Sequence, residues 1–420
     1  MSTSGKTKDY PLYQCRNGVL CMHISDVKLR LLSGSMPVEG EFWEERLSRP
    51  LDVYPEHKAA PGLFGDIRRG ETSSYLIEAV FVQIETDEGV EGLGGPVQPS
   101  VAYIIDTELR WLLQGADPLA SERLWDLMYR HAIHGRKGVT MQAISAVDCA
   151  LWDLRGKAAG LPVYRLLGGP VRETFPAYAS ALGFSLEPER VEQRARAFVE
   201  QGYTATKWFV RHGPSDGRAG IERNLELVRT LRATLGPNID IMLDAWSSWD
   251  VPYTIQMAER LADYDVRWIE EPVLADKIDA CAEIRARSKV PIATGEHEYT
   301  RWGLKQLMDA RAADVLQPDI YWAGGISEML KIAALASVYD LVLIPHGHST
   351  PATAQFIAAQ PPTLCPILEY LIKWNEIHQY FFRSPLRPVD GMITVPTGPG
   401  MGMELDEGKI ESERELRRSA

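Results

Sequence analysis

The sequence has few cysteines, and no pattern groups them. Five occur among 420 residues, and none belongs to a Cys-x-x-Cys pair. An odd and scattered set argues against both a disulfide framework and a zinc cluster. It favours a reducing compartment, for which we expect the cytoplasm.

Long apolar runs are also missing. The polar N-terminus lacks the apolar core of a signal peptide, and residues 1–18 are expected to form a mobile leader. No run approaches the roughly 18 apolar residues that a membrane helix needs. We therefore expect no membrane association.

Basic residues are in the minority. Lys and Arg number 45 against 57 Asp and Glu, which gives a formal net charge of −12. This balance argues against nucleic acid as a partner. The dinucleotide fingerprint G-x-G-x-x-G does not occur. His297-Glu298 begins like the zinc motif H-E-x-x-H, but Arg301 stands where the second His belongs.

The first part of the chain reads as strands followed by helices. A strand is expected at about residues 20–32, a hairpin at 75–94, and helices at 100–115, 119–133 and 139–158. This order predicts an α+β domain over residues 19–165. Residues 34–74, rich in Pro, Gly and charge, have no clear period. We expect them to form a loop that covers the substrate.

Beyond residue 172 short apolar strands alternate with amphipathic helices. Eight strands are expected, at residues 175–179, 205–209, 239–245, 266–270, 291–295, 315–319, 341–345 and 366–370. Repeated strand–helix units imply parallel strands. Eight of them favour a barrel over residues 172–371. An open doubly wound sheet is the alternative, but its usual Gly-rich first turn is missing.

Acidic residues recur where the predicted strands end. Asp244, Glu270 and Glu296 follow one another at about one strand–helix unit, so their side chains should converge at one end of the barrel. Adjacent carboxylates repel one another unless a cation lies between them. All-oxygen ligands suit Mg²⁺. The alternative is that each acid caps the helix that follows it.

Histidines and a lysine occupy neighbouring strand ends. Asp319 precedes His346 by one unit, and an Asp that accepts a hydrogen bond from imidazole raises the basicity of the other ring nitrogen. His346 is thus a candidate general base. His297 either donates to the substrate or points into the wall. Lys207 either balances a substrate carboxylate or pairs with a neighbouring acid.

One stretch resembles a known family. The residues Ala143-Ile-Ser-Ala-Val-Asp-Cys-Ala-Leu-Trp-Asp-Leu-Arg-Gly-Lys157 are similar to a helical signature of the mandelate racemase subgroup of the enolase superfamily. Ile269-Glu-Glu-Pro272 and the segment 395–402 also resemble it. The resemblance implies a capping α+β domain over a modified (β/α)₇β barrel, with residues 372–420 returning to the cap. It also implies one Mg²⁺ per subunit on Asp244, Glu270 and Glu296, and a homo-oligomer.

Within the subgroup the chain is most similar to L-rhamnonate dehydratases. The similar segments are 135–138, 212–215, 294–303 and 317–322. Several family members carry Lys-x-Lys on the second strand, but here Phe209 replaces the second Lys, which argues against a two-base racemase. The run after His346 and the loop around residue 50 differ from the typical rhamnonate enzymes, and both are regions that contact the substrate.

The resemblance implies dehydration of an acid sugar, an aldonic acid, to a 2-keto-3-deoxy acid. His346 would take the C2 proton with Asp319 as its partner, and His346 or His297 would protonate the departing 3-hydroxyl. Lys207 is expected near the carboxylate, and substrate contacts are expected from Glu369, Lys207, His348 and His57. A racemase, epimerase or cycloisomerase of a 2-hydroxy acid is the alternative. A catalytically silent family member is a second one.

Overall fold

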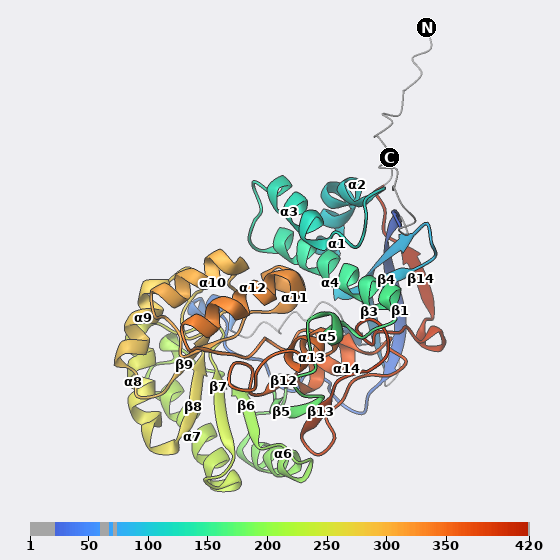
Figure 1. The fold of residues 1–420 in the computed structure, drawn as a ribbon. Helices are drawn as coiled ribbons and strands as arrows, with labels where there is room; N and C mark the ends of the chain where they lie inside the picture. Colours follow the sequence, from blue (N-terminus) through green and yellow to red (C-terminus); the bar gives the residue numbers. More distant parts are fainter. Residues whose placement is uncertain (1–21, 59–66, 70–73, 419–420) are drawn as a thin grey trace.

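The computed structural model describes residues 22–58, 67–69 and 74–418 (Figure 1). The leader expected at residues 1–18 lies outside this part of the chain. Among the described helices, none is long and apolar enough to span a bilayer. Cys149, Cys281 and Cys365 are buried free thiols.

The cap is built on an antiparallel sheet. Its strands are β1 (Ile24–Pro37), β2 (Ile67–Arg69), β3 (Ser74–Thr86), β4 (Glu91–Val97) and β14 (Ser412–Glu415). They run in the order β14-β1-β3-β2, with β4 also on β3. The hairpin prediction is confirmed, but β1 extends past Leu32 to Pro37, which pairs with Ser74. The irregular segment is therefore shorter than predicted, because alternating burial keeps β1 on the sheet to its end.

Helices pack against the antiparallel sheet of the cap. They are α1 (Pro99–Ile104), α2 (Arg110–Leu113), α3 (Ser121–His131), α4 (Val139–Ala159) and α5 (Val163–Leu166). The single helix predicted at 100–115 is divided by a π-helical turn, Ile105–Leu109. The long helix α4 ends as Gly160 takes a φ of +65°, a left-handed conformation that costs glycine little.

The rest of the chain forms a curled parallel sheet. Its strands are β5 (Thr174–Ser180), β6 (Ala205–Phe209), β7 (Asp240–Asp244), β8 (Val266–Glu270), β9 (Ile292–Thr294), β10 (Val315–Leu316), β11 (Val342–Leu343) and β12 (Leu368–Leu371). They are hydrogen-bonded in the order β11-β10-β9-β8-β7-β6-β5-β12, and β13 (Met392–Thr394) adds to β5 antiparallel. The predicted enolase-like fold is thus confirmed as a curled parallel sheet of eight strands in the predicted order.

Two strands are shorter than predicted. We expected β10 to reach Asp319 and β11 to reach Pro345, but they end at Leu316 and Leu343. Pro318 and Pro345 lack the backbone N–H that a central strand must donate, so pairing stops before them. Asp319 and His346 consequently lie in loops beyond the strands.

Helices surround the sheet (Figure 1). They are α6 (Pro188–Glu200), α7 (Gly217–Leu235), α8 (Val251–Leu261), α9 (Ile278–Arg287), α10 (Thr300–Asp309), α11 (Ile320–Ala323), α12 (Gly325–Val338), α13 (Thr350–Ala358) and α14 (Ile372–His378). The inside of the curl has its own cluster of buried side chains: Tyr178, Ala205, Met242, Trp268, Ala293, Ile344 and Ile367. The barrel is therefore packed below its active end, as expected for this architecture.

Helix α4 of the cap holds the segment after β10 in place. The carboxylate of Asp148 accepts hydrogen bonds from Ser327 N (2.9 Å) and Ser327 Oγ (2.6 Å), at the start of α12. The hydroxyl of Tyr321 on α11 accepts from Gly95 N at 3.0 Å. The cap thus fixes the short helix that begins at Asp319, a predicted site residue.

Candidate active site

The three predicted metal ligands lie on neighbouring elements. Asp244 ends β7, Glu270 ends β8, and the two are direct partners in the parallel register. Glu296 lies just after β9, in the segment that leads to α10. They are buried, with exposed fractions of 8%, 1% and 3%. The strand register therefore makes Asp244 and Glu270 neighbours, and Glu296 lies two residues beyond the end of the adjacent strand β9.

Lys207 lies among these acids. Its Nζ lies 2.7 Å from Glu369 Oε1 and 3.7 Å from Asp244 Oδ2, and it also contacts Glu270 Oε1. Burial by itself lowers the pKa of an ammonium, but the surrounding carboxylates, Glu270 foremost, raise the pKa of Lys207 well above its usual value. Of the two interpretations of Lys207, the geometry favours pairing with neighbouring acids.

The second oxygen of Glu270 has partners that sequence reasoning missed. Oε2 accepts from Trp268 Nε1 at 3.0 Å and from Gln317 Nε2 at 2.8 Å. Trp268 precedes Glu270 by two positions on one strand, so the two share a face, and this alternation could have identified it. Gln317 comes from the loop after β10, and no local pattern connects it to Glu270.

Burial makes this cluster unfavourable for negative charge. It raises the pKa of Asp244 well above the usual value and that of Glu296 to about 7, and it also raises the pKa of Glu270. Glu271 adds a further buried carboxylate, whose Oε1 lacks a hydrogen-bond partner among the described residues. Lys207 alone cannot offset so many acids. The donor set consists of carboxylate oxygens with too few neighbouring positive charges, and such a set fits a hard divalent cation.

A second grouping of ligand atoms overlaps the first. Glu271, Glu296 and His297 each place one ligand atom within 4.8 Å of the others. Asp244 and Glu270, the other two predicted ligands, are not in this group, and both approach Lys207 instead. Glu296 is therefore the one residue that belongs both to the predicted ligand set and to this group.

His346 and Asp319 form a hydrogen-bonded pair. His346 Nδ1 lies 2.7 Å from Asp319 Oδ2, while Asp319 Oδ1 accepts from Tyr321 N at 2.7 Å and so caps α11. The other ring nitrogen, Nε2, lies 3.6 Å from Glu296 Oε2. Burial disfavours the charged imidazole, but Glu296 and the hydrogen bond to Asp319 raise the pKa of His346 to about 10. The two predicted partners are therefore together, facing the acids.

His297 forms a second pair that the sequence did not indicate. Its Nδ1 lies 2.7 Å from Glu271 Oε2 and 3.5 Å from Glu296 Oε1. Burial again opposes the charge, yet Glu271 raises the pKa of His297 to about 9. The indole of Trp322 lies between the two histidines, with ring centroids 5.6 Å from His297 and 5.0 Å from His346. Two histidine–carboxylate pairs thus border Glu296.

The remaining predicted contacts lie further out. His348 packs its ring 5.7 Å from Trp322, and its Nε2 lies 3.4 Å from Pro96 O. His57 is exposed in the cap, where its ring lies edge-on to that of Tyr54 with the ring centroids 6.5 Å apart. The structure therefore puts His348 beside the His346 loop, whereas no described contact joins His57 to the acids.

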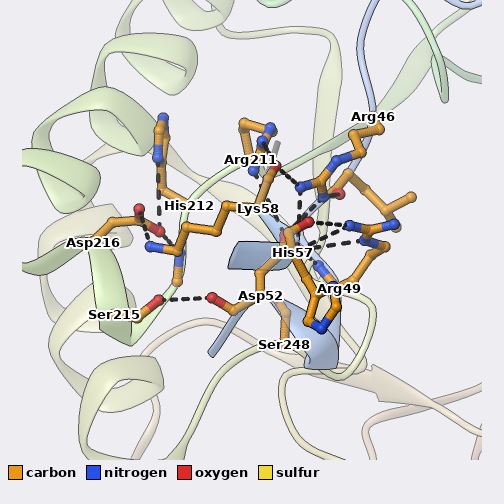
Figure 2. A network of polar contacts seen from close by, with 12 residues as sticks. Arg46, Arg49, Asp52, His57, Lys58, Arg211, His212, Ser215, Asp216 and Ser248 are labelled. Carbon is orange, nitrogen blue, oxygen red and sulfur yellow. Dashed lines mark hydrogen bonds and ion pairs between the residues drawn. The ribbon is translucent and has the colours of Figure 1, made fainter. Parts of the chain in front are cut away.

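A network of charges holds the cap segment 46–58 to the barrel (Figure 2). Asp52 is buried and pairs with Arg46 at 2.7 Å and Arg49 at 3.3 Å, and Arg211 after β6 approaches it to 3.6 Å. Despite burial, these guanidinium groups, with Arg46 first, lower the pKa of Asp52. Lys58 reaches Asp216 at 2.8 Å. The segment is thus docked on the barrel at β6 and α7.

Comparison with known proteins places the chain in a family. Residues 71–168 match the mandelate racemase / muconate lactonizing enzyme N-terminal domain, and residues 190–409 match the enolase C-terminal domain-like family. An L-rhamnonate dehydratase of Saccharopolyspora erythraea is 34% identical over 393 residues, covering 90% of this chain and 93% of that protein. A D-galactarolactone cycloisomerase of Agrobacterium fabrum is 35% identical over 349 residues, covering 79% and 90%.

Solved structures agree with the sequence relatives. The crystal structure of rhamnonate dehydratase from Gibberella zeae complexed with Mg superimposes with a TM-score of 0.79 at 30% identity, covering 92% of this chain and 95% of that one. Both halves of the chain therefore match one fold and one set of relatives. The chain is an enzyme and belongs to the mandelate racemase and muconate lactonizing enzyme family of the enolase superfamily.

Proposed function

We propose that the protein dehydrates an aldonic acid to a 2-keto-3-deoxy acid, as the L-rhamnonate dehydratases it resembles do. The observation that carries the proposal is the His346–Asp319 pair, whose free ring nitrogen faces the buried carboxylates 3.6 Å from Glu296. A base aimed at a cation-binding cluster suits removal of a proton next to a carboxylate.

Asp244, Glu270 and Glu296 are the residues that would hold Mg²⁺. Their oxygens suit this ion better than the set that includes His297, because Mg²⁺ prefers carboxylate ligands. When bound, the ion supplies positive charge that stabilises the negative charge developing on the substrate carboxylate as C2 loses its proton.

His346 takes the C2 proton on Nε2. Asp319 accepts the hydrogen bond from Nδ1, which fixes the tautomer and leaves the lone pair of Nε2 directed at the substrate. Because Glu296 is the main group raising the pKa of His346, the imidazole loses its proton at lower pH when this carboxylate acts as a ligand. His346 is then neutral and able to act as a base.

Elimination follows as the C3–O bond breaks and the 3-hydroxyl leaves as water. The proton comes from His346, which now holds the one taken from C2, or from His297. The resulting enol takes a proton at C3 and loses one from oxygen, which gives the 2-keto-3-deoxy acid. Glu369, Lys207, His348 and His57 stay proposed substrate contacts, with Lys207 also balancing the acids around it.

A panel of aldonic acids tests the proposal. The enzyme is incubated with Mg²⁺ and each acid, L-rhamnonate included, and 2-keto-3-deoxy products are measured. We expect turnover of at least one acid, loss of turnover in His346→Asn with metal affinity retained, and no change in the matched control His134→Asn at an exposed position. Turnover by His346→Asn would show that another residue is the base. If no acid in the panel gives a 2-keto-3-deoxy product, the proposed dehydratase activity is refuted.

A cycloisomerase is the second candidate. Its support is the 35% identical relative that acts on a galactarolactone, together with the His297–Glu271 pair, which supplies a second imidazole beside Glu296. A sugar lactone that isomerises without change of mass, while no acid loses water, would favour it. A racemase or epimerase would instead exchange the C2 proton for deuterium in heavy water. Absence of Mg²⁺ affinity in calorimetry would favour a silent family member.

A further inference from the structure

The cap segment 42–48 follows the edge of the barrel closely. Glu44 N donates to Gly183 O at 2.9 Å, and Ser48 N donates to Val210 O at 2.8 Å. Gly183 has no room for a side chain, because a Cβ there would lie 2.2 Å from the ring of Trp43. Backbone contacts of this kind leave the segment little freedom while they persist.

Lys373 on α14 fastens the same segment. Its buried ammonium donates to Phe42 O at 2.5 Å, Gly183 O at 2.8 Å and Glu44 Oε1 at 3.0 Å. All three N–H donors are therefore used, two of them on the cap segment and one on the barrel. The stem and charge lie over the ring of Phe184, with Nζ 4.1 Å from its centroid. Lys373 thus joins cap and barrel at one point.

The other residues of α14 hold the loop that carries His346. Asn375 Oδ1 accepts from Thr350 Oγ1 at 2.7 Å, and His378 Nδ1 donates to His348 O at 3.0 Å. Just before the helix, Glu369 accepts from Gly347 N at 2.9 Å. The segment from Gly347 to Thr350 is therefore held from β12 and α14.

A single short helix, about 10 Å long, consequently contacts both the cap segment and the His346 loop. We propose that Lys373 is a positioning residue that couples the two: release of segment 42–48 from Lys373 loosens α14 and, with it, the loop from His346 to Thr350. The described polar partners of Lys373 are Phe42, Glu44 and Gly183, and they include neither a predicted metal ligand nor His346. The effect on turnover rests on the proposed function, but the coupling itself does not.

Hydrogen–deuterium exchange of the full-length protein tests the coupling without substrate. In Lys373→Met we expect amide exchange to rise about tenfold or more both in 42–48 and in 346–350, because both segments lose support from one helix. In His378→Phe, which removes only the donor to His348 O, exchange should rise in 346–350 alone. The control Lys305→Met, which breaks an exposed pair with Asp309, should change neither segment.

The results separate coupling from simple anchoring. Exchange that rises only in 42–48 of Lys373→Met would overturn the proposal, since Lys373 would then hold the cap alone. If Lys373→Met does not fold, Glu44→Gln weakens one of the three contacts and should raise exchange in both segments to a smaller degree. With a turned-over acid, Lys373→Met should raise KM and lower kcat together, and Lys373→Arg should recover part of both. Failure of the acid panel leaves the exchange result to decide the coupling.

Discussion

His378 offers a test of how burial controls ionisation near the site. It is buried between Trp374 and His348, with ring centroids 5.0 Å and 4.6 Å away, and its Nδ1 donates to His348 O. Burial first, and the neighbouring His348 second, lower the pKa of His378 to about 3. We predict that His378→Phe destabilises the protein at pH 8 and that the loss shrinks as pH falls.

The magnitude at pH 8 follows from the hydrogen bond. Phe keeps the ring packing but leaves His348 O without its donor, which costs about 1–3 kcal/mol for a buried acceptor. At pH 8 His378 is neutral in both folded and unfolded chains, so ionisation adds nothing to this difference. The variant should therefore be less stable by that amount.

The sign of the pH effect follows from linkage. The unfolded His378 takes up a proton below pH 6.5, whereas the folded one does so only near pH 3. The folded wild type therefore loses stability between these values, by about 2 kcal/mol at pH 5. Phe does not titrate, so the gap in unfolding free energy between wild type and variant should narrow by that amount.

Urea unfolding of both proteins at pH 8 and pH 5 measures the gap, with exposed His134→Phe as the matched control. NMR titration of the histidine resonances supplies the pKa directly, with His378 identified by its absence from the variant. A gap that is equal at both pH values, or a His378 resonance that titrates near 6.5, would refute the reasoning.

Three other substitutions test separate parts of the structure. Lys207→Met removes the cation of the acid cluster and should lower the free energy of unfolding by about 3–5 kcal/mol without metal; melting curves should show that Mg²⁺ restores more stability to this variant than to the wild type. Asp52→Asn leaves Arg46 without its anion; we expect KM to rise more than kcat falls, and an unchanged KM would contradict docking of the cap segment. Gly325→Ala places a methyl 2.3 Å from Asp148 Oδ2 at a φ of +80°. Thermal denaturation should show that the free energy of unfolding falls by more than about 2 kcal/mol, and a neutral result would contradict close packing of α4 against the start of α12.

The sequence predicted the parts of the site that depend on strand periodicity. Asp244 and Glu270 end strands whose bounds were readable from apolar runs flanked by turns, and parallel register then makes them neighbours. The spacing of Asp319 and His346 carried the same information, even though both lie in loops, because each follows its strand by a similar distance. Periodicity fixes the order around the barrel, and burial of one face fixes the register.

The partners within the site could not be predicted in this way. Lys207 was open to two interpretations, and only the positions of Glu270 and Glu369 favour one of them. Glu271 follows Glu270 directly, and the sequence assigned it no role, yet it reaches His297. Such choices depend on how loops turn after the strands, and loop conformation has no period in the sequence.

Backbone strain explains why Glu271 reaches that position. Its φ is +40°, and Trp246 and Ser247, which follow Asp244 on the adjacent strand, have φ values of 40° and 60°. Non-glycine residues hold such angles only when their surroundings enforce them, at roughly 1–3 kcal/mol each. Ser247 N donates to Glu271 O at 2.6 Å, so the two strained turns support one another.

This mutual support has a consequence for the site. Glu271, which holds one of these strained angles, is also the main group that raises the pKa of the His297 imidazole. The strain is therefore stored where two acidic strands end, and the packing of the barrel beneath them, with Trp268 and Met242 fully buried, supplies the stability that holds it. Propensity at single positions favours relaxed turns there, so the sequence alone did not indicate the His297–Glu271 pair.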